Sequence, residues 1–238
     1  MSARTVIDLI RESPAAAVLL FLRHASYLMG PIQGRYQTPN EATAANYAEL
    51  EPPCLFLLDD AGIQLSRQQG WRLAEAGIAV REIVASHQGR GPDTGLRISE
   101  GHHQATSRWI PVRCHAAVDY PRYNFGPVLR CLNGIGDPFV AQWLNGQHPD
   151  LVRSDTPRSF RGRVMGFVDD LLAVPGVAIV TSHFENVTLV HGRAVEGRDL
   201  GTVREDWFPT KSGGVILVRQ PGGAQTAHDF RPDLTIVE

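Results

Sequence analysis

The stretch that most constrains the fold is a short apolar run, Val18–Leu22, that ends abruptly in Arg23 and His24. Bounded apolar runs of this length are typical of buried strands, often the central parallel strand of an α/β sheet. Open α/β sheets bind their ligands just beyond the carboxyl ends of such strands. Taken alone, the Arg-His pair fits a polar turn after a buried strand better, but the rest of the chain changes that interpretation.

Apolar runs and amphipathic stretches alternate along the chain. Further strands are predicted at 81–86, 177–182 and 214–219, and helices at 4–12, 59–75, 94–109, 154–173 and 185–193. Strands that alternate with helices indicate a sheet covered on both faces. We therefore predict an α/β fold: a three-layer sandwich with a mostly parallel central sheet and helices on both faces.

The length of 238 residues suffices for one sizeable core, so we expect a single domain over residues 1–238. Two stretches rich in Gly, Pro and Asn, near 29–53 and 111–150, are interpreted as loop insertions. The first of them includes a helical turn at 41–50. Long loops in compact domains commonly act as lids or binding loops, and Arg35 in the first insertion is a candidate to reach a substrate.

Composition excludes several classes of partner. The formal net charge of −2 provides no general attraction to nucleic acid or to an anionic membrane, so any anion site must be local. Cys54, Cys114 and Cys131 have no metal-like spacing and fit a reducing compartment. The N-terminal segment lacks the pattern of an export signal, and no apolar run approaches membrane-spanning length. We expect a cytoplasmic protein.

Polar side chains suited to anion binding follow three of the predicted strands: Arg23-His24, Ser86 with Arg90 after it, and Ser182-His183. If the strands are neighbours, these side chains converge at one edge of the sheet. Guanidinium groups match phosphate oxygens bidentately and keep their charge near neutral pH. A histidine with one unprotonated, oriented ring nitrogen can act as a nucleophile near pH 7. The pattern predicts a site for a phosphoryl group.

The order and spacing of these motifs resemble the histidine phosphatase superfamily, also called phosphoglycerate mutase-like. Its signatures are an apolar strand followed by Arg-His-Gly, a strand and Ser-rich turn with an Arg and a Thr four residues later, and an apolar strand ending in Ser-His. The corresponding stretches of this chain are Leu22–Ala25, Ala85–Gly95 and Val180–His183. The resemblance extends over roughly residues 16–219.

The resemblance implies a metal-independent phosphatase mechanism without a cofactor. His24 would attack phosphorus and form a phosphohistidine, while Arg23, Arg90 and His183 would hold the phosphoryl oxygens. His183 would thus be catalytic alongside His24, and Ser26 is a further candidate for substrate binding.

A carboxylate downstream of the second arginine would protonate the leaving oxygen and later take a proton from water. Asp119 is the first candidate for this acid, and Glu100 is the reserve. Asp119 has a surface carboxylate as its alternative interpretation, and for Glu100 an exposed helix carboxylate is the favoured interpretation.

The chain departs from the family pattern at several positions. Ala25 replaces the usual Gly, Phe184 and Glu185 replace glycine-rich residues, and Ser26 and Gly30 stand where mutases have Glu and Asn. An acidic Glu185 would repel a second phosphate and suit a cationic or polyhydroxyl substrate. These departures weaken the case for a glycolytic mutase more than the case for phosphate hydrolysis.

The sequence therefore favours a phosphomonoesterase acting on a small phosphorylated metabolite. Two alternatives stay open: a phosphoglycerate mutase-like phosphoryl transferase, and a catalytically silent member that binds phosphate esters or a protein partner. The expected partner is a small-molecule phosphate ester, with neither nucleic acid nor membrane. The oligomeric state is not determined, and a homodimer is among the options.

Overall fold

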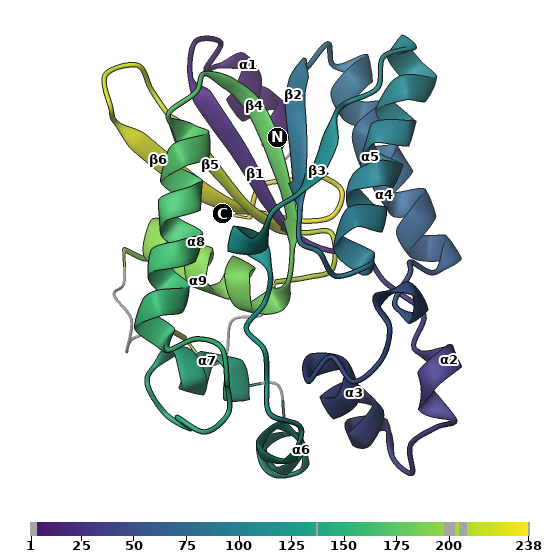
Figure 1. The fold of residues 1–238 in the computed structure, drawn as a ribbon. Coiled ribbons are helices and arrows are strands. Elements are labelled where there is room, and N and C mark those ends of the chain that lie inside the picture. Colours follow the sequence, from purple (N-terminus) through teal and green to yellow (C-terminus); the bar gives the residue numbers. More distant parts are fainter. Residues whose placement is uncertain (1–3, 137, 198–202, 205–208, 238) are drawn as a thin grey trace.

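The computed structural model describes residues 4–136, 138–197, 203–204 and 209–237. Among these residues a six-stranded sheet has the order β3-β2-β4-β1-β5-β6 (Figure 1). The strands are β1 (Ala17–Arg23), β2 (Val80–Ala85), β3 (Val112–Cys114), β4 (Gly176–Ser182), β5 (Gly214–Arg219) and β6 (Gln225–Phe230). Strands β3, β2, β4 and β1 are parallel, whereas β5 is antiparallel to both of its neighbours. The predicted mostly parallel sheet is confirmed.

Strand β1 lies between two separate hydrophobic cores because its side chains alternate across the sheet. Leu19 and Phe21 belong to the core on one face, and Leu20 and Leu22 to the core on the other. All four side chains are nearly inaccessible to solvent. A strand buried on both faces requires a continuous apolar run, which is the pattern that the sequence shows.

Helices cover both faces of the sheet, as expected of a three-layer α/β sandwich (Figure 1). One face carries α8 (Pro157–Leu172) and α9 (Phe184–Ala194), and the other carries α1 (Val6–Arg11), α4 (Asp60–Glu75) and α5 (Arg90–Thr106).

Side-chain caps determine where two of these helices begin. Asp59 caps α4 by accepting a hydrogen bond of 2.7 Å from the Gly62 amide, as the sequence predicts. Helix α8 begins later than predicted, because Thr156 is its cap and forms a capping box with Ser159. Pro157 then occupies the first turn, where a missing amide proton has no cost.

The two expected loop insertions contain more helix than the sequence indicated. The first holds α2 (Gly30–Gln33), α3 (Pro39–Tyr47) and part of the 3-10 turn Pro53–Leu55, and the second holds β3, the 3-10 turn Ala116–Val118, α6 (Phe125–Gly134) and α7 (Phe139–Leu144). Helices α3 and α6 meet through a hydrogen bond of 2.7 Å from Asn40 Nδ2 to Asn133 Oδ1. In Figure 1 these helices lie beyond the carboxyl end of β1.

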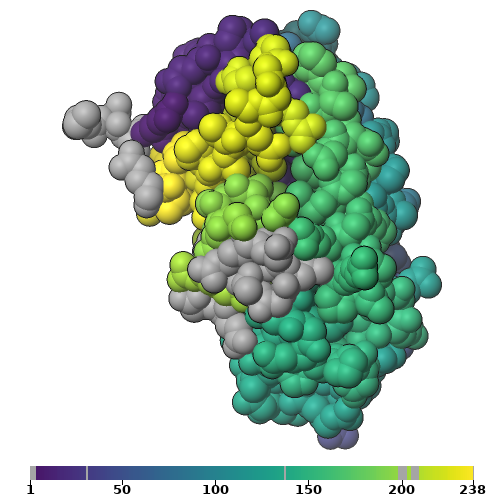
Figure 2. Space-filling model, turned by 90° about the vertical axis from the view of Figure 1, so that its left-hand side faces the viewer, coloured from purple at the N-terminus to yellow at the C-terminus, as the bar shows by residue number. Residues whose placement is uncertain are grey.

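The ends of the described chain lie together. Figure 2 shows the N-terminal segment in purple beside the C-terminal hairpin in yellow. The Val6 amide donates to the Leu234 carbonyl, and the Ile236 amide donates to the Arg4 carbonyl, each over 2.9 Å. Within the described part of the chain, no helix combines the length and apolarity needed to cross a bilayer.

Candidate active site

Strand β1 delivers His24 to the carboxyl edge of the sheet, where the main chain holds it. The His24 amide donates to the Ser182 carbonyl over 2.8 Å, and the side chain is only 3% exposed. Nδ1 lies 2.8 Å from the Ala25 carbonyl oxygen, so this nitrogen carries the proton and donates it. Nε2 accepts a hydrogen bond of 3.0 Å from Arg90 Nε. The geometry therefore leaves Nε2 unprotonated, with its lone pair directed at Arg90.

Arg90, in the first turn of α5, is buried against aromatic rings. Its guanidinium carbon lies 4.9 Å from the Tyr27 ring centroid, 5.5 Å from that of Tyr120 and 5.7 Å from that of Phe56. Nη1 donates to Asn46 Oδ1 over 3.1 Å. Among the described ion pairs Arg90 has no carboxylate partner. Burying a cation without a counter-ion costs free energy, and an anionic ligand would offset that cost.

His183 reaches the same place from the end of β4. Its ring centroid lies 5.2 Å from that of His24, and its Nε2 is 2.6 Å from Ser86 Oγ. A Cβ at Gly91 would lie 2.4 Å from that hydroxyl, so glycine lets α5 approach closely enough for Ser86 to stay between helix and histidine. His183 Nδ1 is buried and has no hydrogen-bond partner among the described residues, which leaves it free for a ligand atom.

Arg23 completes the group. It pairs in register with Ser182, and its guanidinium lies 5.3 Å from the Phe184 ring centroid. Nη1 donates to the Pro209 carbonyl over 2.9 Å, whereas the buried Nε has no partner among the described residues. The Arg23 guanidinium thus keeps one nitrogen, Nε, that can donate a hydrogen bond to a ligand.

Burial and neighbouring charges keep both histidines neutral. Burial lowers the pKa of His24 well below its ordinary value, and Arg90, His183 and Arg23 lower it further. The pKa of His183 is lowered by burial and by the two arginines. The site therefore presents neutral imidazoles between permanent cations. This arrangement can bind a dianion and attack it with nitrogen.

The chain was compared with known proteins by sequence and by structure. No protein-family model matches the sequence, and a search of curated proteins finds no significant match. Solved structures do match. A phosphoglycerate mutase from Bacillus anthracis superposes with a TM-score of 0.60 at 12% identity, over 92% of this chain and 94% of that one. The chain has the phosphoglycerate mutase-like fold.

Two further structures with this fold carry phosphatase names. A mycobacterial glucosyl-3-phosphoglycerate phosphatase matches with a TM-score of 0.61 at 12% identity, over 90% of this chain and 97% of that one. A proposed alpha-ribazole-5'-P phosphatase from Escherichia coli matches with a TM-score of 0.62 at 16% identity, over 94% of this chain and 100% of that one. These superpositions show the fold that the sequence predicted. At 12–16% identity they do not show the substrate.

Within the phosphoglycerate mutase-like fold of this chain, Glu185 has an unusual environment. The side chain is 1% exposed, and Oε1 accepts a hydrogen bond of 3.0 Å from the Tyr123 hydroxyl. Burial raises the pKa of the Glu185 carboxyl, although Arg90 and Arg23 act in the opposite direction. The sequence indicated Glu185 only as a departure from the family pattern. Its burial and its pairing with Tyr123, 62 residues away, depend on the tertiary structure.

The two candidates for the general acid lie in different surroundings. Asp119 Oδ1 accepts from the His87 amide over 2.6 Å, and Oδ2 lies 3.0 Å from His87 Nδ1. His87 directly follows Ser86, whose hydroxyl lies 2.6 Å from His183 Nε2. Glu100 instead pairs with Arg67 (2.7 Å) and Arg97 (3.0 Å) between α4 and α5. The catalytic role of Asp119 stays a prediction.

Ser26 and Arg35 are engaged with carboxylates. Ser26 Oγ donates to Asp59 Oδ1 over 2.5 Å, and Arg35 Nη1 pairs with Glu51 Oε2 over 2.7 Å. The Arg35 side chain is 56% exposed. Among the described contacts neither side chain meets the two histidines, and their roles in substrate binding stay predictions.

Ala25, which replaces the glycine of the family pattern, is accommodated. It is fully buried, its amide donates to Thr94 Oγ1 over 3.0 Å, and its φ is not in the positive region. The backbone at this position therefore has no need of glycine.

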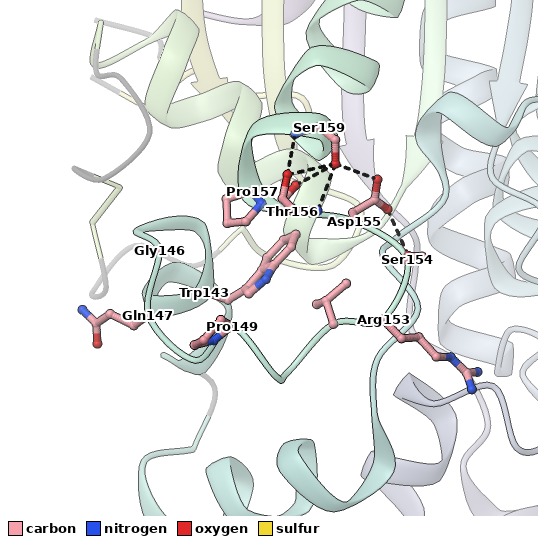
Figure 3. A pocket seen from close by; sticks show the side chains of 11 residues that line it. Trp143, Gly146, Gln147, Pro149, Arg153, Ser154, Asp155, Thr156, Pro157 and Ser159 are labelled. Carbon is pink, nitrogen blue, oxygen red and sulfur yellow. Dashed lines mark hydrogen bonds between the residues drawn. The ribbon is translucent and has the colours of Figure 1, made fainter.

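A cavity of about 400 Å³ lies apart from this site, between α7 and the start of α8 (Figure 3). Its walls include Trp143, Arg153 and Asp155, and none of the four residues Arg23, His24, Arg90 and His183 lines it. Among the described residues, no three or more histidine, cysteine or acidic side chains gather as metal ligands.

Proposed function

We propose that this protein is a histidine phosphatase, a phosphomonoesterase that hydrolyses a small phosphorylated metabolite through a phosphohistidine on His24. The observation that carries the proposal is the orientation of His24. Its Nδ1 is held by the Ala25 carbonyl and its unprotonated Nε2 faces Arg90. A buried neutral imidazole beside two guanidinium groups has the form required of a nucleophile toward a phosphate dianion.

In the first step His24 Nε2 attacks phosphorus. The N–P bond forms while the P–O bond to the leaving alcohol breaks, and Arg23, Arg90 and His183 stabilise the phosphoryl oxygens. Asp119 gives a proton to the leaving oxygen. In the second step Asp119 takes a proton from water, the water oxygen bonds to phosphorus, and the N–P bond breaks. Inorganic phosphate leaves and His24 returns to its neutral form.

The vacant hydrogen-bonding capacity of the site supports this assignment. Arg23 Nε and His183 Nδ1 are buried without partners among the described residues, and Arg90 has no carboxylate partner there. Buried polar groups in folded proteins are normally satisfied. Phosphoryl oxygens would satisfy these nitrogens and supply the missing negative charge.

A phosphoryl transferase is the second candidate, since one similar structure is a phosphoglycerate mutase. Transfer requires an acceptor alcohol to replace water at the phosphohistidine. Adding acceptor alcohols separates the two: isomerised ester in place of free phosphate would assign a transferase.

The proposal is tested with a panel of phosphate esters, assayed for phosphate release with and without chelator and with vanadate as inhibitor. We expect turnover that survives the chelator, and a phosphoenzyme label that is stable in alkali and labile in acid. His24→Ala should lower kcat by roughly 10³-fold or more, because the nucleophile is gone. His103→Ala, on α5 and stacked on Trp109 away from the site, is the matched control. Undiminished hydrolysis by His24→Ala would overturn the assignment.

A further inference from the structure

Lys211 is the single lysine in the sequence; every other member of the 23 basic Lys and Arg residues is arginine. A lysine ammonium is a compact point charge on a flexible stem, whereas a guanidinium is a planar fork. The environment of this one ammonium can therefore show what kind of anion it binds.

The Lys211 ammonium lies at the candidate active site. Its Nζ is 5.0 Å from the centroid of the Tyr27 ring. The same ring meets His24 edge-on at 5.2 Å between centroids, and the Arg90 guanidinium lies 4.9 Å from its centre. A single aromatic ring thus connects the ammonium to the candidate nucleophile and to its arginine.

The main chain fixes the segment that carries Lys211. The Ser212 amide donates to the carbonyl oxygens of Arg23 (3.0 Å) and His24 (3.4 Å). In return, Arg23 Nη1 donates to the Pro209 carbonyl. Ser212 adopts a φ of 61°, and its carbonyl accepts from Gln69 Nε2 over 2.8 Å. Lys211 is therefore attached to the strand end that bears the candidate nucleophile.

The ammonium has no ion pair or hydrogen bond among the described residues. The carboxylate of Asp59 acts on it electrostatically, but Asp59 accepts from Ser26 and from the Gly62 amide instead. Burial and the neighbouring Arg23 lower the pKa of Lys211. The side chain nevertheless remains partly exposed. A partly desolvated cation beside two guanidinium groups is repelled by its surroundings, and an anionic ligand would relieve that repulsion.

We propose that Lys211 determines specificity by binding a second anionic group, a carboxylate or a further phosphate, on the leaving part of the substrate. This inference rests on the proposed phosphatase function. The scissile phosphoryl group is matched by Arg23 and Arg90, so the additional cation is available to another anion of the same ligand. Glu185 does not oppose this, because it is buried and bonded to Tyr123, whereas Lys211 is exposed.

The test compares esters that differ only by the second charge. Phosphoglycolate and ethyl phosphate differ by a carboxylate in place of a methyl group, and longer carboxyalkyl and alkyl phosphates extend the series. In the wild type we expect kcat/KM to favour the carboxylated ester by about tenfold at the best chain length. Lys211→Met should bring this ratio close to one, and Lys211→Arg should keep most of the preference.

A chemical readout follows from the single lysine. Lys211 and the α-amine are the two amines that an acylating reagent can modify, and the α-amine serves as the internal reference. Phosphoglycolate should slow acylation of Lys211 several-fold relative to the α-amine, and ethyl phosphate at equal occupancy should protect less. Equal protection by both ligands would overturn the assignment.

Failure of this inference is distinguishable from failure of the proposed function. If the wild type hydrolyses esters but shows no preference for the second anion, or if Lys211→Met slows both esters equally, the role of Lys211 is wrong and the phosphatase stands. If no ester turns over, the phosphatase is wrong. Thermal stabilisation by phosphoglycolate over ethyl phosphate, lost in Lys211→Met, would then still support the anion site.

Discussion

The floor of the candidate site and its rim are built differently. The floor, His24, Arg90, His183 and Glu185, is at most 3% exposed. The rim consists of the Asp119–His87 pair and Lys211, whose side chains reach solvent to varying degrees. Burial dominates the pKa shifts resolved for His24, His183 and Glu185 on the floor. In the proposed function, the buried floor carries the chemistry, while the exposed rim recognises the rest of the ligand.

The difference follows from how each part is supported. Two floor histidines follow adjacent parallel strands, so main-chain hydrogen bonds of the sheet position them. Rim residues come from connecting segments outside the sheet. Low local dielectric makes each floor interaction strong, and solvent screens those at the rim. We therefore expect the largest losses of activity at the floor residues assigned to the phosphoryl group.

Arg90→Ala is expected to cause the largest effect among substitutions that spare the nucleophile. It removes the donor to His24 Nε2 and a cation facing the phosphoryl oxygens, so kcat/KM should fall by roughly 10³-fold. Arg97→Ala on the same helix removes ion pairs with Asp93 and Glu100 away from the site and is the matched control. Steady-state kinetics on one ester measures kcat/KM for both variants. Comparable losses of kcat/KM in the two would contradict a special role of the floor.

Asp119→Asn is expected to have an intermediate effect that depends on the leaving group. If Asp119 protonates the departing oxygen, kcat for alkyl phosphates should fall by about 10²-fold, and kcat for p-nitrophenyl phosphate by about fivefold or less. Nitrophenolate needs little protonation, which explains the difference. Glu100→Gln is the comparison: a larger leaving-group dependence in that variant would transfer the acid role to Glu100.

Glu185→Gln is expected to have the smallest effect, on stability rather than on chemistry. Because burial raises the pKa of Glu185 above its ordinary value of about 4.5, the folded state holds its proton more tightly than the unfolded chain. Stability from this group is complete below that value and is lost as pH rises through the raised pKa. Glutamine does not titrate, so the variant does not lose stability in this way. The melting temperature of Glu185→Gln relative to that of the wild type should therefore increase from pH 5 to pH 8, in buffers without phosphate.

The two histidines change stability with pH in the opposite direction, but equally in the variant and the wild type, so their effect cancels in the difference. Their pKa values are lowered, so the unfolded chain binds protons first as pH falls below about 6.5, and stability decreases there in both proteins. A difference between variant and wild type that shrinks as pH rises would contradict a raised pKa for Glu185.

Much of the fold was predictable because its signals are local. The apolar run before Arg23, the Asp59 cap and the strand at 214–219 match the observed elements. Elements that the sequence did not predict are stabilised by tertiary contacts. Helix α3 was expected only as a turn, yet a capping box at Thr38 and packing against α6 form it. Strand β3 has three residues and, among the described strands, pairs with β2 alone, so no periodicity identifies it.

The sequence by itself determined which side chains stand at the ends of the strands, because an apolar run fixes both strand and end point. Parallel pairing of those strands then brings together His24, Arg90 and His183. Only the tertiary structure decided the partners that have no periodic signal: Glu185 with Tyr123, Asp119 with His87, and Lys211 with Tyr27. Such pairs join residues far apart in the chain, and packing of whole elements sets their distances.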